Sequence, residues 1–113
     1  MIKNIEYNIW DNKKEAFNKV IFEIQEMDPF IYTKANTNFL RNLDLEEFAK
    51  VIFNEMIVSP KEAKEIEYWK NDIEGINEFS LILSEFQEGF YKPKQKRPKY
   101  TWKKEQNLLN EEV

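Results

Sequence analysis

The chain has 113 residues, of which 34% are charged and 42% hydrophobic, a composition typical of one globular domain. It contains no cysteine and no histidine, which excludes disulfides, zinc and haem sites, thiol nucleophiles and Ser-His-Asp triads. Two glycines are too few for a phosphate-binding loop of the P-loop or dinucleotide type. We therefore expect a protein that binds rather than catalyses, with no enzyme activity, metal or cofactor.

Sequence patterns also bear on location. No apolar run approaches the roughly 20 residues of a membrane span, and residues 1–6 lack the apolar core of a secretory signal. Asn, Lys, Ile, Glu and Phe are abundant and Ala is scarce, which indicates an AT-rich gene of a low-GC bacterium or its phage. We expect a cytoplasmic protein of a bacterial host, with no membrane partner.

The charge is unevenly distributed along the chain. Residues 1–91 hold 10 Lys or Arg against 18 Asp or Glu, a net charge of −8, whereas residues 92–113 hold seven basic and three acidic groups, a net charge of +4. Apolar periodicity stops at Tyr91, and Pro93 and Pro98 follow closely. We predict an acidic helical domain over residues 1–91 and a basic, flexible tail over residues 92–113.

The first part of the chain gives one weak strand signal and one helix signal. Residues 4–10 alternate apolar and polar side chains, which predicts an edge strand paired with residues 31–33 or with another chain. A first helix is predicted from Asp11 or Asn12 to about Met27, ended by Asp28-Pro29. Its apolar stripe consists of Phe17, Val20, Ile21 and Ile24. Residues 30–42 are predicted to form a loop with a short strand or helical turn.

The second part of the chain is predicted to form three helices. Asp44 is a good N-cap with Glu47 three residues later, so a helix is predicted up to about Met56. Ser59-Pro60 predicts the start of a third helix, with a bend around residues 72–75. Spacings of three and four predict a last helix over about residues 76–90. The fold class predicted is mainly all-α, a small bundle of three to four helices with at most one short N-terminal strand.

Asp and Glu carboxylates are the only abundant side chains that could act in catalysis or bind a metal ion. They form two groups, Asp44, Glu46 and Glu47, and Asp72, Glu74 and Glu78. Such groups can hold a hard divalent cation, but neither matches the register of a Ca²⁺-binding EF-hand loop. Acids near helix starts are favoured by the helix dipole, so we interpret both groups as caps and solvated faces.

The aromatic residues and the basic tail are the candidate binding features. Exposed aromatic side chains such as Trp10 would anchor a protein partner. The tail could neutralise phosphates while its aromatics stack on bases, dock on an acidic protein, or fold back across the acidic domain. The −8 charge of residues 1–91 weakens the nucleic-acid hypothesis. The candidate partner-binding residues are Trp69, Tyr68, Phe86, Phe90, Glu62, Glu65 and Asp72, and the tail candidates are Lys94, Lys96, Arg97, Lys99, Tyr100 and Trp102.

One stretch resembles a known family. Residues 43–61, with Glu46-Glu47-Phe48 opening a helix and Val58-Ser59-Pro60-Lys61 forming a turn, resemble the middle of phage tail assembly chaperones. Residues 68–72 and Ser84-Glu85-Phe86 are similar to the later part of that family's pattern, so the resemblance covers about residues 43–90. Residues 1–42 match none of its patterns, and some members begin with a clearer β-hairpin.

The resemblance implies a small, largely helical, non-catalytic protein that coats the tape measure protein and recruits tail-tube subunits. The alternative from another class is a small acidic phage or mobile-element inhibitor of a host nucleic-acid enzyme, which presents carboxylates where phosphates would sit. Its acids would be Glu62, Glu65, Glu67, Asp72, Glu74 and Glu78. A nucleic-acid-binding accessory protein that uses the tail is the third hypothesis. The sequence leaves the oligomeric state open.

Overall fold

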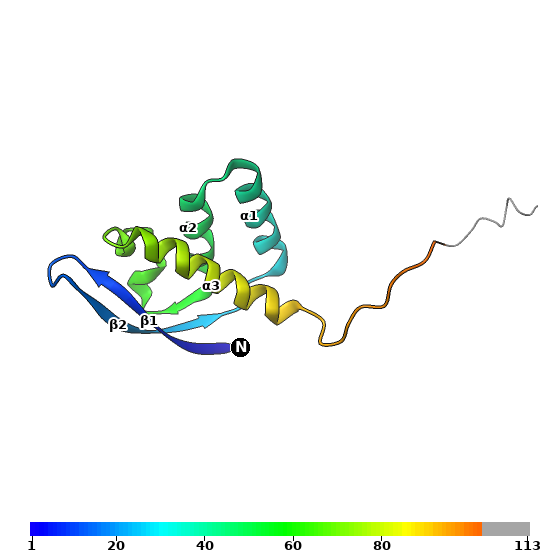
Figure 1. The fold of residues 1–113 in the computed structure, drawn as a ribbon, viewed down its shortest axis with the longest axis horizontal. Helices are drawn as coiled ribbons and strands as arrows, with labels where there is room; N and C mark the ends of the chain where they lie inside the picture. Colours follow the sequence, from blue (N-terminus) through cyan, green and yellow to red (C-terminus); the bar gives the residue numbers. More distant parts are fainter. Residues whose placement is uncertain (103–113) are drawn as a thin grey trace, which may run out of the picture.

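A computed structural model describes residues 1–102 of the chain (Figure 1). Two long strands open the fold, and three α-helices, a short strand and two 3₁₀ turns follow. In chain order these are β1 (Ile2–Asp11), β2 (Ala16–Gln25), α1 (Pro29–Asn42), α2 (Leu45–Met56), β3 (Ile57–Ser59), η1 (Lys61–Lys64), η2 (Ile66–Trp69) and α3 (Ile73–Tyr91). The fold is therefore α+β, and the prediction of a mainly all-α bundle is wrong.

The three strands form one antiparallel sheet in the order β1-β2-β3. Strands β1 and β2 pair along their whole lengths, from Ile2 opposite Gln25 to Asp11 opposite Ala16. Because directly opposed residues share a face, Tyr7 and Val20 lie on the face that packs on the core, where Phe22 is buried. The strand predicted over residues 4–10 is confirmed within β1, but its partner is β2 rather than residues 31–33 or another chain.

Strand β2 replaces the helix predicted up to Met27. The apolar positions of this segment fit both a helical and a strand period, and its Val-Ile-Phe-x-Ile run is rich in β-branched and aromatic side chains. Pairing with β1 decides between the two, since alternation places Phe22 and Ile24 in the core. Asp11 does not cap a helix; its carboxylate accepts hydrogen bonds from the backbone of Lys13 and Lys14 in the turn between the strands.

Helix α1 occupies the segment that the sequence predicted to be a loop. The side chain of Asp28 accepts hydrogen bonds from the backbone N–H groups of Phe30 (2.8 Å) and Ile31 (3.3 Å), and Pro29 takes the first helical position. The Asp28-Pro29 pair therefore starts a helix instead of ending one. Leu43 ends α1 in the left-handed conformation, with φ of 55°.

The later helices agree with the sequence in part. The helix after Asp44 is confirmed as α2, with the Asp44 carboxylate accepting from the N–H of Glu47 at 3.1 Å. The third helix predicted from Ser59 is replaced by β3 and two 3₁₀ turns, and the Ser59 hydroxyl donates to Glu23 instead of capping (3.0 Å). The last predicted helix is confirmed as α3, and Asp72, where we expected a bend, is its N-cap.

The core is centred on Trp69. Its ring lies 5.7 Å from that of Phe22, 5.0 Å from Phe53 and 5.2 Å from Phe79, and all four side chains are fully buried. The indole N–H donates to the backbone carbonyl of Ala63 at 3.0 Å, so its polar atom is satisfied. Figure 1 shows the β1–β2 hairpin on one side of the molecule, α3 running across it and the α1–α2 pair beyond.

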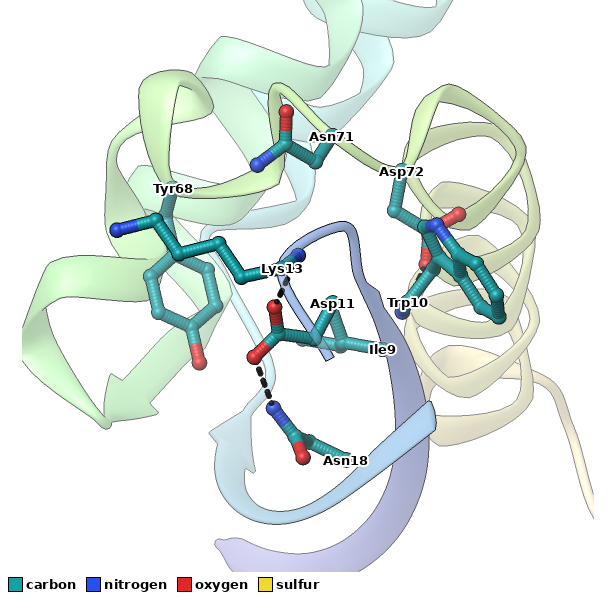
Figure 2. A pocket seen from close by; sticks show the side chains of 8 residues that line it. All are labelled: Ile9, Trp10, Asp11, Lys13, Asn18, Tyr68, Asn71 and Asp72. Atoms are coloured by element: carbon teal, nitrogen blue, oxygen red, sulfur yellow. Dashed lines mark hydrogen bonds between the residues drawn. The ribbon is translucent and has the colours of Figure 1, made fainter. Parts of the chain in front are cut away.

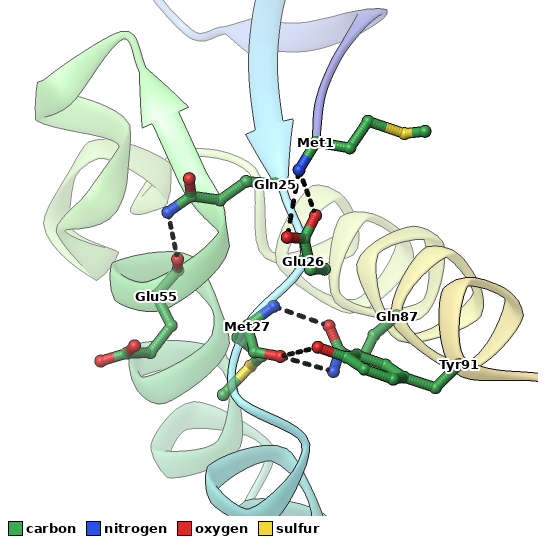
Figure 3. A network of polar contacts seen from close by, with 7 residues as sticks. All are labelled: Met1, Gln25, Glu26, Met27, Glu55, Gln87 and Tyr91. Carbon is green, nitrogen blue, oxygen red and sulfur yellow. Dashed lines mark hydrogen bonds and ion pairs between the residues drawn. The ribbon is translucent and has the colours of Figure 1, made fainter.

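Polar contacts fix α3 along the hairpin. The Tyr7 hydroxyl donates to Glu78 at 2.7 Å, and the N–H of Trp10 donates to Asp72 at 3.0 Å. At the other end of β2, the terminal amine of Met1 pairs with Glu26 at 2.8 Å (Figure 3).

Among residues 1–102, no helix combines the length and apolar character that crossing a membrane requires.

The segment after α3 is not part of this packing. Helix α3 ends at Tyr91, the last residue of the predicted acidic domain, and residues 92–102 contain no helix or strand and are exposed. The remainder of the predicted tail, with Lys103 and Lys104, lies outside the residues that the structure describes.

Candidate functional site

A hollow of about 220 Å³ lies among the three α-helices, and we call it the α1–α3 groove. All three helices contribute side chains to its walls. They are Tyr32, Asn36 and Phe39 of α1, Leu45 and Phe48 of α2, and Asn77, Ser80, Leu81, Ser84 and Glu88 of α3.

The groove follows from the way α1 is attached. Only Leu43 and Asp44 separate α1 from α2, so the two helices pack together, and Tyr32 and Ala35 are the buried residues of α1. Helix α3 packs against α2 and reaches the same region. The Tyr32 hydroxyl donates to Glu88 at 2.6 Å and so joins the α1 and α3 walls.

The surroundings of Tyr32 make its phenol a weaker acid than usual. Burial first, and then the hydrogen bond to the Glu88 carboxylate, raise the pKa of the Tyr32 phenol to about 12, while a hydrogen bond with Ser84 acts in the opposite direction. Both main causes disfavour the phenolate, because a desolvated negative charge would face a carboxylate. Tyr32 therefore stays a neutral donor at physiological pH.

Exposed leucines border the groove. Leu81, which lines it, has 59% of its surface exposed. Leu40, with 67% exposed, follows Asn36 by one turn and so lies on the same side of α1. Large apolar side chains gathered beside a hollow are typical of a contact surface rather than of scattered surface residues.

One polar atom in the groove wall has no partner. Ser80 is 2% exposed, and among residues 1–102 its hydroxyl oxygen has no hydrogen-bond partner. A buried hydroxyl without a partner costs about 1–3 kcal/mol. The protein therefore keeps a polar group in this wall that its own described residues do not satisfy.

The exposed face of α3 next to the groove is acidic, although Glu88 is the only carboxylate in the groove wall itself. Helix α3 contains Glu74, Glu78, Glu85 and Glu88 but neither lysine nor arginine. Glu46 and Glu47 at the start of α2 do not line the groove, and Lys50 pairs with Glu46 at 3.2 Å. A ligand that covers Leu81 would therefore lie next to Glu85 and Glu88, which follow Leu81 on α3 by one and two turns.

The predicted aromatic binding residues lie elsewhere. Trp69 was predicted to bind a partner, but its side chain is fully buried at the centre of the core and no partner could contact it. Tyr68 is half-buried with its ring packed edge-on against Trp69, and Phe86 is half-buried against the core. Phe90 is exposed near the end of α3, beside Tyr91. None of these four lines the α1–α3 groove.

The predicted acids are also separated. Glu62 and Glu65 are exposed, whereas Asp72 is half-buried and accepts hydrogen bonds from the backbone of Trp10 and Gly75. Asp72 therefore holds the hairpin to the start of α3. Within residues 1–102, no three acidic side chains are grouped so that they could hold a metal ion.

A second hollow, of about 290 Å³, lies where the hairpin tip meets the start of α3 (Figure 2). Its polar groups bond mainly to one another. Asp11 accepts from Asn18 at 3.0 Å and from the backbone of Lys13 at 2.9 Å, and backbone hydrogen bonding, chiefly from Lys14, lowers the pKa of Asp11. We interpret this hollow as structural and the α1–α3 groove as the candidate site.

The candidate residues of the basic tail stay exposed. Lys94, Lys96, Arg97 and Lys99 lie on the surface of a segment without regular structure. Tyr100 and Trp102 are also exposed, and their ring centroids lie 5.7 Å apart. The structure brings none of these residues to the α1–α3 groove.

The groove residues of α1 were missed because residues 30–42 were predicted to be a loop. The signal that could have found α1 is Asp28-Pro29, an N-cap followed by proline at the first helical position. No signal places α1 beside α3, since the two helices are separated by α2, β3 and the 3₁₀ turns. Comparisons with protein-family models, curated proteins and solved structures found no match for this chain.

Proposed function

We propose that this protein is a non-catalytic protein-binding factor similar to a phage tail assembly chaperone, which engages tape measure and tail-tube proteins in the cytoplasm of a bacterial host. The observation that carries the proposal is the α1–α3 groove, with Leu40 and Leu81 exposed beside it. Binding of a partner to these apolar side chains is favourable because it removes apolar surface from water.

The resemblance to that family supports the proposal from a different direction. Residues 43–90 span α2 to nearly the end of α3, and these helices form two of the three walls of the groove. The β1–β2 hairpin is also an element with which some members of that family begin. These two features favour a chaperone over an unrelated binding protein.

The groove lining supports a binding role rather than catalysis. Its side chains are leucines, aromatics, asparagines and hydroxyls, with Glu88 as the only carboxylate. Glu88 accepts the hydrogen bond from Tyr32, so it is held in a structural contact. A general acid or base needs a free titratable group within reach of a substrate, and this lining offers none beyond that pair.

The test is affinity capture with the tagged full-length chain in its own infected or induced host. Bound proteins are identified by mass spectrometry at low and at high salt. We expect a tape measure or tail-tube protein that is retained at high salt, because apolar contacts are weakly screened. Capture of a host nucleic-acid enzyme that high salt releases would contradict the chaperone proposal.

The acidic surface supports a second candidate, the inhibitor that mimics phosphates. Glu62 and Glu65 are exposed, and α3 carries four glutamates and no basic residue. This candidate predicts steep loss of affinity with salt and weakened binding after Glu62→Lys or Glu65→Lys. Nucleic-acid binding through the exposed Tyr100 and Trp102 would instead be lost on deletion of residues 92–113.

A further inference from the structure

We propose that the α1–α3 groove receives a single amphipathic helix of the partner protein, with leucine-like side chains in the groove and basic residues along its flank. This inference rests on the proposed protein-binding function and names the kind of partner segment. The apolar face of the docked helix contacts Leu40 and Leu81, and its basic flank faces Glu85 and Glu88, which follow Leu81 on α3 by one and two turns.

The architecture of the groove favours a helix over an extended segment. Its walls are α-helices, whose interior N–H and C=O groups bond within each helix, so an extended peptide finds no strand edge with which to pair. A helix needs only side-chain packing, with anchors at positions i, i+3, i+4 and i+7. Added beside α1 and α3, it would make a fourth helix packed in the manner of a bundle.

Charge complementarity indicates the composition of the flank. Each of Glu74, Glu78, Glu85 and Glu88 lies on α3, and no lysine or arginine of that helix offsets them. A helix with acidic flanks would bring like charges together, which costs affinity, whereas lysines or arginines would be attracted.

Two other occupants fit less well. The basic tail has the right charge, but Pro93 and Pro98 interrupt it and residues 92–102 form no helix. A second copy of the chain would approach with a domain of net charge −8 and the same acidic α3. Self-association through this face is therefore opposed by repulsion.

The test uses designed peptides and the full-length protein. The probe is a fluorescent helical peptide with leucines at i, i+3, i+4 and i+7 and lysines on both flanks of that stripe. One control peptide carries glutamates in place of the lysines, and another has the composition of the probe in scrambled order. Binding is followed by fluorescence anisotropy, and circular dichroism checks that every protein variant is folded.

Leu81→Glu and Leu40→Glu are the groove variants, and Ile21→Glu is the matched control. All three side chains are more than half exposed, so the fold should tolerate each change, and Ile21 lies on the solvent face of the sheet. Each substitution adds one negative charge, which by itself would strengthen the binding of a basic peptide. We expect the probe to lose about tenfold or more in affinity with either groove variant, which corresponds to about 1.4 kcal/mol, and to bind Ile21→Glu like the wild type.

Several results would overturn the proposal. They are equal binding of the scrambled or acidic peptide, an unchanged affinity of both groove variants, or the same loss with Ile21→Glu. A dimer that Leu81→Glu dissociates would assign the groove to a second copy, and tighter probe binding after deletion of residues 92–113 would assign it to the tail.

The failure of this inference is distinct from that of the proposed function. If affinity capture retains tail proteins with wild-type protein and with both groove variants alike, the chaperone function stands and the groove is not its docking site. If the probe binds as expected but no tail protein is captured, the groove binds a basic helix and the chaperone function fails.

Discussion

Gln87 and Met27 are joined by two hydrogen bonds although 60 residues separate them. The backbone N–H of Met27 donates to Oε1 of Gln87 at 2.8 Å, and Nε2 of Gln87 donates to the carbonyl oxygen of Met27 at 2.9 Å (Figure 3). The Gln87 side chain is fully buried. The pair connects the last turns of α3 with the end of β2, directly before Asp28 starts α1.

Replacing Gln87 with leucine should destabilise the fold. The apolar side chain is of similar size but leaves a buried N–H and a buried C=O of Met27 without this partner. We expect the free energy of unfolding to fall by about 2–4 kcal/mol, measured by urea denaturation. Gln87→Glu keeps the acceptor for the N–H but cannot donate when the carboxylate is ionised. The free energy of unfolding of this variant should therefore fall less at acidic than at neutral pH. A Gln87→Leu protein as stable as the wild type would contradict this role.

Trp69 should be the most sensitive single side chain of the core. Trp69→Ala removes a fully buried ring and the hydrogen bond to Ala63, and we expect a loss of about 3–5 kcal/mol of unfolding free energy. Trp69→Phe keeps most of the volume and should lose less. The matched control is Trp102→Ala, at an exposed position, which should stay within about 0.5 kcal/mol of the wild type in the same denaturation experiment. Equal effects at the two positions would show that Trp69 is not the centre of the core.

Removing the Ser80 hydroxyl should stabilise the protein. Its oxygen is buried without a hydrogen-bond partner among the described residues, so Ser80→Ala removes a desolvation cost. We expect a gain of about 1 kcal/mol in unfolding free energy, measured by thermal or urea denaturation. Ser59→Ala is the control, because that hydroxyl donates to Glu23 at 3.0 Å, and it should destabilise instead. A loss of stability in Ser80→Ala would indicate a partner that the described residues do not show.

Alkaline pH should weaken the fold through Tyr32. Its pKa is raised from 10.0 to about 12, so the folded state holds the phenolic proton more tightly than the unfolded chain. The resulting stabilisation is complete below pH 10 and is lost as the pH rises from about 10 to about 12. Tyr32→Phe cannot ionise, so its unfolding free energy should fall less than that of the wild type between pH 9 and 11 (about one unit either side of the ordinary value). If the free energies of unfolding of the two proteins changed equally with pH, the raised pKa of Tyr32 would be contradicted.

Part of the fold was predictable because its causes are local. The Asp44 cap and the apolar stripe of α2 lie within a few residues of one another, and so do the spacings that predict α3. The alternation over residues 4–10 predicts a strand for the same reason. The candidate site was not predictable, because the α1–α3 groove depends on Leu40 and Leu81, which lie on different helices.

The sequence by itself determined that the chain lacks cysteine and histidine and that its charge is divided between residues 1–91 and the tail, and it predicted the helix after Asp44 and a last helix over about residues 76–90. Only the tertiary structure decided that residues 16–25 form β2. Their apolar positions satisfy both a helical and a strand period. Pairing with β1 selects the strand, because the alternation of a strand places Phe22 in the core against Trp69. The tertiary structure also decided which large side chains are hidden: Trp69 is covered by residues from β2, α2 and α3, while Leu40 and Leu81 remain uncovered because α1 packs on α2 and leaves a groove along α3.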